Sequence, residues 1–230
     1  MTEKSVIDTS PLPQGKRLPL SVKSIGAQNR AAAAEERRQA ILDAALTEFA
    51  EHGFAGARLD DVARRAGVAK GTIYLLAKDK QDLLQQVVLR SLAPLLERLT
   101  PPRPAPATID EFRALMEFFR AEVMQTNRRL VAQIILREGG RFPEIAAFWH
   151  REVVTKILAY VADAVLRAER DGLLRSSAYA RFPQLVMAPM LFALVWDTQF
   201  AKFAPLDISG LLGAHFEALF GADASRDNQS

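Results

Sequence analysis

Apolar residues recur at helical spacing along most of the chain, and this period constrains the fold more than any other feature of the sequence. Residues 41–49 give a clear example, because Ile41, Leu42, Ala45, Leu46 and Phe49 form one stripe of a 3.6-residue period. No stretch shows the sustained two-residue alternation of a half-buried β-strand. The sequence therefore predicts an all-α protein of about nine helices.

Glycines, prolines and capping residues set the expected helix boundaries. Gly53 is expected to end the first helix, with Phe54 folding back onto it. Asp79 is a candidate N-cap, and Thr108 with Glu111 has the spacing of a capping box. After the helix that begins near Arg30, the expected helices are 59–66, a short one from Lys70, 80–99, one that follows Thr108, 130–137, 143–169, 178–203 and 208–220.

The absence of certain residue types and motifs excludes several classes of function. The chain has no cysteine, which excludes disulfides, thiolate metal sites and cysteine nucleophiles, and which suits a reducing cytoplasm. His52, His150 and His215 are far apart in sequence, and there is no nucleophile elbow or glycine-rich phosphate loop. We therefore expect no catalytic residue, no metal ligand and no cofactor, and the protein is predicted not to be an enzyme.

The sequence also argues against a membrane location. The longest uncharged apolar run, residues 185–196, falls well short of the roughly 20 residues that cross a bilayer, and it contains Pro189. The first thirty residues lack the apolar segment of a secretory signal. A cytoplasmic protein is expected.

Positive charge is concentrated in the N-terminal part of the chain. Residues 1–90 hold 14 Lys and Arg against 11 Asp and Glu, whereas residues 91–230 hold 16 of each. A surplus of three positive charges suits a phosphate-binding surface, although a solvated tail would give the same balance.

Two short helices around Gly67 have the arrangement of a helix-turn-helix. The glycine permits a tight turn, and small residues such as Ala63 and Ala66 let the helices cross closely. The second helix can then enter the major groove of DNA, which is wide enough to accept it. The residues predicted to contact DNA are Arg58, Lys70, Gly71, Thr72, Tyr74, Lys78 and Lys80.

These residues have distinct expected roles. Lys70 and Thr72 begin the second helix and are placed to reach base edges, whereas Tyr74 is placed to reach a phosphate. Lys80, at the positive end of the following helix, is expected to make a charge-assisted phosphate contact. Arg64 and Arg65 are expected to be exposed helix charges and not contacts, and Lys78 is either a contact or a solvated side chain.

Residues 37–83 closely resemble the DNA-binding domain of the TetR family of bacterial repressors. The resemblance rests on the first helix ending in FAEHGF, on the segment DDVARRAGVAKGTIY, and on KDKQDL at the start of the fourth helix. The chain departs from the family at Leu76 and Ala77, where many members have an aromatic residue or His followed by Phe or Val. It also has Ala57 and Arg58 where members often carry a Thr or Ser cap, so that cap is expected to be lost.

The resemblance implies a three-helix helix-turn-helix domain followed by a larger helical domain for ligand binding and dimerisation. The expected divisions are a disordered basic arm over 1–29, the DNA-binding domain over 30–83, the larger domain over 84–221 and a polar tail over 222–230. The basic arm could reach a minor groove, but a solvated tail is favoured.

In the larger domain, aromatic and aliphatic residues are the candidates for a ligand site and a dimer surface. Gln133, Arg137, Glu152 and Asp197 are its candidate polar groups. The predicted ligand contacts are Phe112, Met116, Phe119, Gln133, Arg137, Trp149, Val153, Phe192 and Trp196. The predicted dimer contacts are Leu185, Leu191, Leu194, Leu212, Phe216 and Leu219, with the internal core of a monomer as the alternative.

Together these features predict a homodimeric repressor of transcription that binds a near-palindromic double-stranded operator. A small hydrophobic or aromatic effector is expected to release it, through the helix 80–99 that is shared by both domains. A TetR-like protein that binds DNA without an effector, as a nucleoid or division factor, is the alternative, and activation in place of repression stays open.

Overall fold

The computed structural model describes residues 22–99, 106 and 108–221. The chain forms two compact units, residues 1–38 and 39–230, and each is described by itself. Every described residue that belongs to regular secondary structure is helical, and this confirms the all-α prediction. No described helix is both long enough and apolar enough to cross a bilayer.

Helix α1 (Val22–Gly56) begins earlier than the sequence indicated. Residues 22–29 were assigned to a disordered arm, but they are helical, and the assignment is wrong for them. The cause is local, because no proline lies between Pro19 and the run of four alanines at 31–34, and alanine is the best helix former. Residues 1–21, the remainder of the predicted arm, lie outside the described residues.

Three further helices complete the helix-turn-helix region, namely α2 (Leu59–Arg65), α3 (Lys70–Leu76) and α4 (Lys80–Leu99). Gly67 adopts a φ of +67° in the turn between α2 and α3, and the Val68 N–H donates to the Ala63 carbonyl at 3.0 Å. Asp79 is confirmed as the cap of α4, because its Oδ1 accepts the Asp82 N–H at 2.8 Å. As expected, α2 lacks a side-chain cap at Arg58.

The other helices are α5 (Ile109–Phe119), α6 (Arg128–Glu138), α7 (Pro143–Trp149), α8 (Thr155–Arg170), α9 (Ala178–Arg181), α10 (Gln184–Gln199) and α11 (Ile208–Phe220). A π-helical turn, η1 (Arg120–Met124), extends α5, and a second, η2 (His150–Val154), joins α7 to α8. The predicted helix 143–169 is therefore one continuous run. The capping box of Thr108 and Glu111 is confirmed at the start of α5.

The predicted helix 178–203 is two helices. Phe182 lies between α9 and α10 with φ −131° and ψ 78°, and Pro183 follows it. A residue before proline is pushed out of the α region by the proline ring, and this explains the break. Helix α10 also ends at Gln199, four residues before the predicted end.

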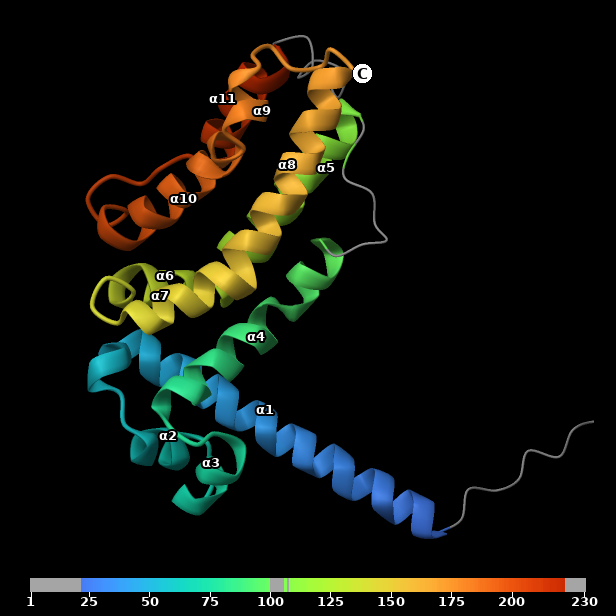
Figure 1. The fold of residues 1–230 in the computed structure, drawn as a ribbon. Coiled ribbons are helices and arrows are strands. Elements are labelled where there is room, and N and C mark those ends of the chain that lie inside the picture. The colour runs from blue at the N-terminus through green and yellow to red at the C-terminus, as the bar shows by residue number, and fades with distance from the viewer. Residues whose placement is uncertain (1–21, 100–105, 107, 222–230) are drawn as a thin grey trace, which may run out of the picture. The chain divides into compact units, whose positions relative to one another are not determined.

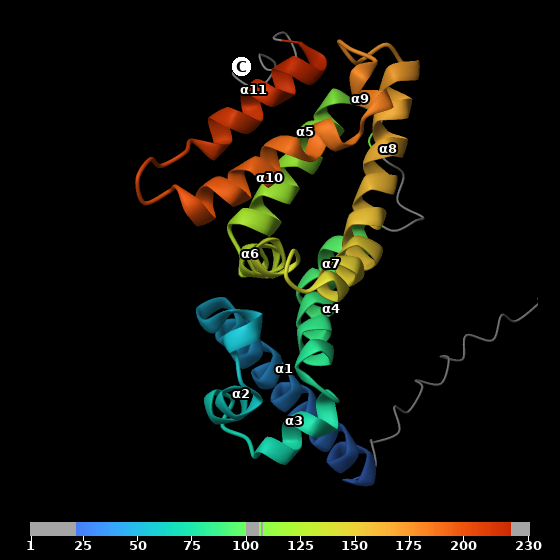
Figure 2. The same cartoon turned by 60° about the vertical axis from the view of Figure 1, so that its left-hand side comes forward.

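The helices of the second unit enclose two hydrophobic clusters. The first runs from Phe49 of α1 through Leu84 of α4 to Val131 of α6, and the second joins α5, α8 and α11 around Phe112 and Phe216. Helix α4 contacts both α6 and α8, and α10 lies beside α11 (Figures 1 and 2). Helix α4 therefore belongs both to the helix-turn-helix and to the larger helical assembly.

A backbone turn at Gly53 fixes the end of α1 against the end of α6. Gly53 has φ 70° and ψ 170°, and the next N–H, of Phe54, donates to the buried carboxylate of Glu138 at 3.2 Å. Arg137 donates to the Phe49 carbonyl at 3.0 Å, and the Phe54 ring meets Phe142 edge-on at 4.9 Å between ring centres.

We expect Gly53→Ala to lower the free energy of unfolding by about 2 kcal/mol or more. Such φ and ψ values are essentially restricted to glycine, and strain of this kind costs on the order of 1–3 kcal/mol. A Cβ at this position would also lie 2.5 Å from Glu138 Oε1. Urea denaturation followed by circular dichroism measures the change.

Gly140→Ala is the matched control, because Gly140 is exposed and a Cβ there meets no atom within 4 Å. Equal stability of the two variants would contradict the role given to Gly53.

Candidate nucleic-acid interface and apolar cavity

Helix α3 presents one exposed face and buries the other. Ile73 is completely buried and anchors the helix, whereas Lys70, Gly71 and Tyr74 are exposed and Thr72 is half-buried. Open space surrounds Gly71, since a Cβ there would meet nothing within 4 Å, so another molecule can approach the backbone closely. The structure thus places these four predicted DNA contacts on one short helix.

The other predicted contacts lie outside α3. Arg58 is exposed directly before α2, and Lys78 is exposed between α3 and α4. Lys70 pairs with Asp60 at 2.7 Å, and this hydrogen bond raises the pKa of Lys70 and lowers that of Asp60. Both side chains are about half exposed, so the pair is weak and Lys70 can exchange Asp60 for another acceptor.

Lys80 has a structural position that the sequence did not indicate. Its Nζ donates to the carbonyls of Ala55 and Ala57 at 3.0 and 3.1 Å and lies 4.9 Å from the centre of the Phe54 ring. Burial lowers the pKa of Lys80, and the nearby carboxylate of Glu138 opposes that shift. The ammonium group is thus bonded to the chain that leaves α1 in the absence of DNA, and the phosphate contact of Lys80 stays a prediction.

Leu75 is a surface residue that sequence reasoning missed. It is 88% exposed, the highest value among the large apolar side chains that the structure describes. A signal was present in the sequence, because Leu75 follows the core residue Ile73 by two positions, which is about 200° around a helix. An apolar residue on the outer face of α3 was thus predictable.

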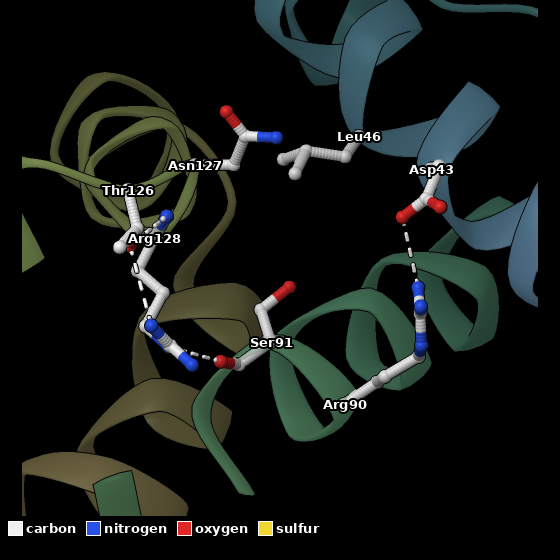
Figure 3. A pocket seen from close by; sticks show the side chains of 7 residues that line it. All are labelled: Asp43, Leu46, Arg90, Ser91, Thr126, Asn127 and Arg128. Atoms are coloured by element: carbon white, nitrogen blue, oxygen red, sulfur yellow. Dashed lines mark hydrogen bonds and ion pairs between the residues drawn. The ribbon is translucent and has the colours of Figure 1, made fainter. Parts of the chain in front are cut away.

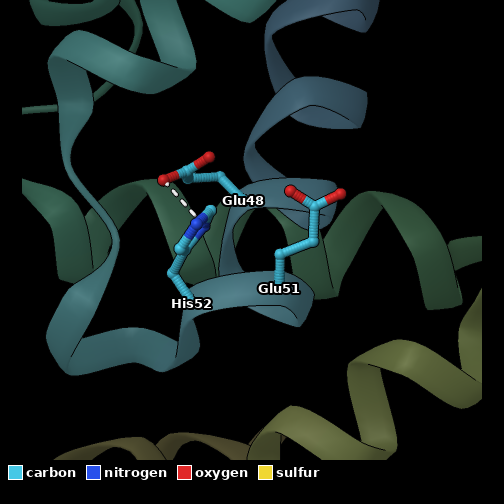
Figure 4. Close-up of side chains that lie close together, drawn as sticks. All are labelled: Glu48, Glu51 and His52. Carbon is cyan, nitrogen blue, oxygen red and sulfur yellow. Dashed lines mark ion pairs between the residues drawn. The ribbon is translucent and has the colours of Figure 1, made fainter.

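An ion-pair network ties α2 to α1. Arg65 contacts Glu48 at 3.4 Å and Glu51 at 2.5 Å. His52 Nδ1 lies 3.1 Å from Glu48, with Glu51 beside them (Figure 4). In the sequence, His52 is far from the other two histidines. In α1, His52 lies within about one turn of Glu48 and Glu51, and one possible metal-binding atom of each side chain lies within 4.8 Å of the other two. The guanidinium of Arg65 contacts both of these carboxylates, and Arg64, as expected, is an exposed helix charge.

An apolar cavity of about 410 Å³ lies between α4, α6, α10 and the two helices that contain π turns. Its lining residues are Leu92, Leu95, Phe119, Val123, Arg128, Ala132, Trp149, Val153, Val154, Ile157, Leu158, Gln184, Met187, Ala188, Met190, Leu191 and Leu194. Of the predicted ligand contacts, Phe119, Trp149 and Val153 line this cavity. Whether they touch a ligand stays a prediction.

The other predicted ligand contacts lie elsewhere. Phe112 is in the core around α5, α8 and α11, and Met116 packs at the edge of that core. Gln133 donates to Asp197 at 3.2 Å, and Arg137 bonds the end of α1. Phe192 and Trp196 form a ladder of rings on α10 with Phe200. The spacing of apolar residues along the sequence did not indicate which face of each helix borders the cavity.

A separate polar hollow of about 320 Å³ lies where α1, α4 and the start of α6 meet (Figure 3). Arg90 pairs with Asp43 at 2.9 Å on one side of it. Arg128 lines both this hollow and the apolar cavity, and its Nε donates to the Ser91 carbonyl of α4 at 2.7 Å. The charged side chains at the edge of the hollow, Asp43, Arg90 and Arg128, thus already have partners.

The outer face of α10 is apolar and uncharged. Leu185, a predicted dimer contact, is exposed there, with Phe192 and Val195 beside it. Leu191, the other exposed dimer candidate, lies on the side of α10 that lines the cavity. The prediction is corrected for four other residues, which are buried within their own chain, namely Leu194, Leu212, Phe216 and Leu219. The bulky stripe of α11 faces inward, and its outward positions hold small residues such as Gly213 and Ala214.

Comparison with known proteins gives one family. Residues 41–87 match the family model for bacterial regulatory proteins of the tetR family. The chain is 30% identical to the HTH-type transcriptional repressor BepR of Brucella suis, over 70% of this chain and 79% of BepR. It is 34% identical to the fatty acid metabolism regulator protein of Bacillus subtilis, over 44% of this chain and 53% of that protein.

Among solved structures, the SmeT–triclosan complex superposes with a TM-score of 0.67 and 25% identity, covering 82% of this chain and 94% of SmeT. Three curated relatives that are 34–44% identical to the chain, the fatty acid metabolism regulator among them, are covered over only 35–56% of their own length.

We expect Lys80→Met to lower the free energy of unfolding by about 1 kcal/mol, because it removes two hydrogen bonds to backbone carbonyls. Lys78→Met is the control, since Lys78 is exposed, and it should change stability by less than about 0.5 kcal/mol. Chemical denaturation measures both. Reduced affinity for DNA in a Lys80→Met variant that keeps its stability would support the predicted phosphate contact of Lys80.

Proposed function

The chain belongs to the TetR family of bacterial regulatory proteins, and we propose that it is a dimeric repressor that an apolar small molecule releases from DNA. The proposed operator is double-stranded and near-palindromic, since two related recognition helices read two half-sites. The observation that carries this proposal is an exposed recognition helix in the same compact unit as an apolar cavity.

The exposed face of α3 supports DNA binding. Lys70 and Thr72 lie in its first turn, where a recognition helix meets base edges, and Tyr74 follows one turn later. Arg58 and Lys78 are exposed just outside the helix and suit phosphate contacts. Gly71 lets the backbone approach the groove closely.

The outer face of α10 supports dimerisation. An exposed helix face without charge is costly in water, and burying it against a second copy removes that cost. Helices α10 and α11 of two chains would form a four-helix bundle, with Leu185 and its exposed neighbour Phe192 between them and the small residues of α11 permitting close approach. Sedimentation of the free protein tests this assembly.

The cavity supports a small apolar effector. Its volume of about 410 Å³ falls in the usual range for ligand sites, and most of its lining side chains are aliphatic. The related SmeT has been solved in complex with triclosan. An effector-free DNA-binding protein is the alternative, and a larger domain without a cavity would have favoured it.

Helix α4 supports coupling between the two sites. Its first residue, Lys80, holds the chain around Ala55 and Ala57, whereas Leu92 and Leu95 line the cavity. A ligand that displaces the second half of α4 would alter the separation of the recognition helices in a dimer. Coupling of about 1–3 kcal/mol would lower operator affinity roughly 5- to 150-fold.

Fluorescence anisotropy with the DNA upstream of the protein's own gene tests the proposal, with a scrambled duplex as reference at about 150 mM salt. We expect a preference of about a thousandfold or more for the upstream DNA, the low end for specific regulators. No preference there, or at any site in a genome-wide binding map, would contradict sequence-specific regulation.

Lys70→Ala should weaken specific binding more than Arg64→Ala. Lys70 lies at the start of the recognition helix, whereas Arg64 is an exposed charge at the end of α2 paired with Asp61. The same anisotropy titration compares the two variants. Equal losses would contradict the placement of α3 in the groove.

A further inference from the structure

Among the described residues, the wall of the apolar cavity carries no uncompensated charge. Arg128 is the one charged residue of those described side chains that line it. Its terminal nitrogen donates to the Glu122 carboxylate at 2.5 Å, and its Nε donates to the Ser91 carbonyl. Arg128 and Glu122 are mostly shielded from water, with 18% and 31% of their side chains exposed.

This pairing decides which ligands the cavity can accept. An anionic group inside it would have to displace Glu122 from Arg128 or lie in apolar surroundings without a counter-charge, and either step is costly. A cationic group would find no carboxylate among the lining residues. Gln184 and Trp149 are the lining residues that offer a hydrogen bond to a neutral molecule.

We propose that this cavity binds uncharged apolar molecules and excludes carboxylates, sulfonates and phosphates of the same size. This deepens the proposed function, on which it rests for the identity of the cavity as the effector site. The selection arises from the Glu122–Arg128 pair and not from the volume of the cavity.

Two fluorescent naphthylamines that differ in charge test the selection directly. The neutral N-phenyl-1-naphthylamine should bind the full chain at least tenfold more tightly than the anionic 8-anilino-1-naphthalenesulfonate. Ala132→Trp fills the cavity and should abolish the neutral probe's binding, whereas Ala34→Trp, on an exposed part of α1, should not. Circular dichroism checks that both variants fold.

Glu122→Gln gives a second test that does not rely on filling the cavity. It leaves the Arg128 charge without its carboxylate, so affinity for the anionic probe should rise at least fivefold while neutral binding changes less than twofold. Glu117→Gln, which removes a carboxylate from an exposed pair with Arg120 on the same helix, should change neither.

Equal affinity of the wild type for the two probes, or no gain of anion binding in Glu122→Gln, would overturn the inference. Operator DNA that only anionic compounds release would overturn it too, while leaving the proposed repressor intact. Selective binding of the neutral probe by a chain with no operator would instead remove the proposed function alone.

The exposed Leu75 carries a second inference independently. An 88% exposed leucine on the recognition helix cannot form a hydrogen bond with a base or a phosphate. It lies one turn beyond Gly71, where the surface of the helix is open. The apolar group that DNA presents in the major groove is the 5-methyl of thymine.

We infer that Leu75 packs on a thymine methyl group in each half-site and so helps to select the operator sequence. This rests on the proposed function, because α3 must lie in the major groove. Burying one methyl group changes affinity about fourfold.

Replacing each operator thymine by deoxyuridine, which lacks only that methyl, tests the contact. The wild type should lose about fourfold in affinity at one position of each half-site and should bind the other substituted duplexes normally. Leu75→Ala should lose this sensitivity, and Leu166→Ala, at an exposed leucine of α8, should keep it.

Specific binding of the operator without any uracil-sensitive position would overturn this inference and leave the proposed function standing. The same penalty in the wild type and in Leu75→Ala would overturn it as well.

Discussion

The buried carboxylate of Glu138 is held where the end of α1 meets the end of α6, and much of the second unit depends on that contact. A carboxylate that is 8% exposed needs partners, since burying an unpaired charge is costly. It receives the Phe54 N–H and the guanidinium of Arg137, 3.3 Å away. Gly53 makes the approach possible, because a Cβ there would lie only 2.5 Å from the carboxylate oxygen. The segment that precedes α2 and the helix that lines the cavity are thus fixed to each other by backbone as well as side-chain atoms.

Helix α4 shares this dependence at its first residue and again at its middle. Lys80 bonds the carbonyls that follow Gly53, so the turn at α1 also sets where α4 begins. Further along, the Ser91 carbonyl accepts from Arg128, the same guanidinium that Glu122 neutralises at the cavity wall. The groups that make the cavity electrically neutral are therefore the groups that hold α4 in place. A ligand that perturbs these groups would act on the recognition helices through α4 itself, which runs from the cavity to the helix-turn-helix. Only a few charged hydrogen bonds would need to change.

The sequence predicted what local chemistry determines. Helices α4 and α11 have the expected bounds, and the caps at Asp79 and Thr108 form, because a capping side chain bonds the backbone only three residues away. Tertiary packing determined the rest. The apolar stripe of Leu212, Phe216 and Leu219 on α11 could face either its own chain or a partner. Only the packing of the neighbouring helices determines that it faces its own chain. Phe119 lines the cavity and Phe112 does not, although both were predicted to contact a ligand. Lys80 matched the family pattern for phosphate binding, while its actual acceptors lie more than twenty residues earlier in the chain.

The two π turns set the rotational register of the helices that leave the cavity. Each lies where its helix borders the cavity, η1 beside Phe119 and η2 beside Trp149. A π turn accommodates one residue more than an α turn, and such turns often mark functional sites. Removing that residue would rotate everything beyond it by about 100°. For α8 this would turn Val161 and Val165 out of the second hydrophobic cluster. The extra residue of η2 therefore determines both the wall of the cavity and the packing of the second hydrophobic cluster. A deletion or insertion in this turn would disturb both together.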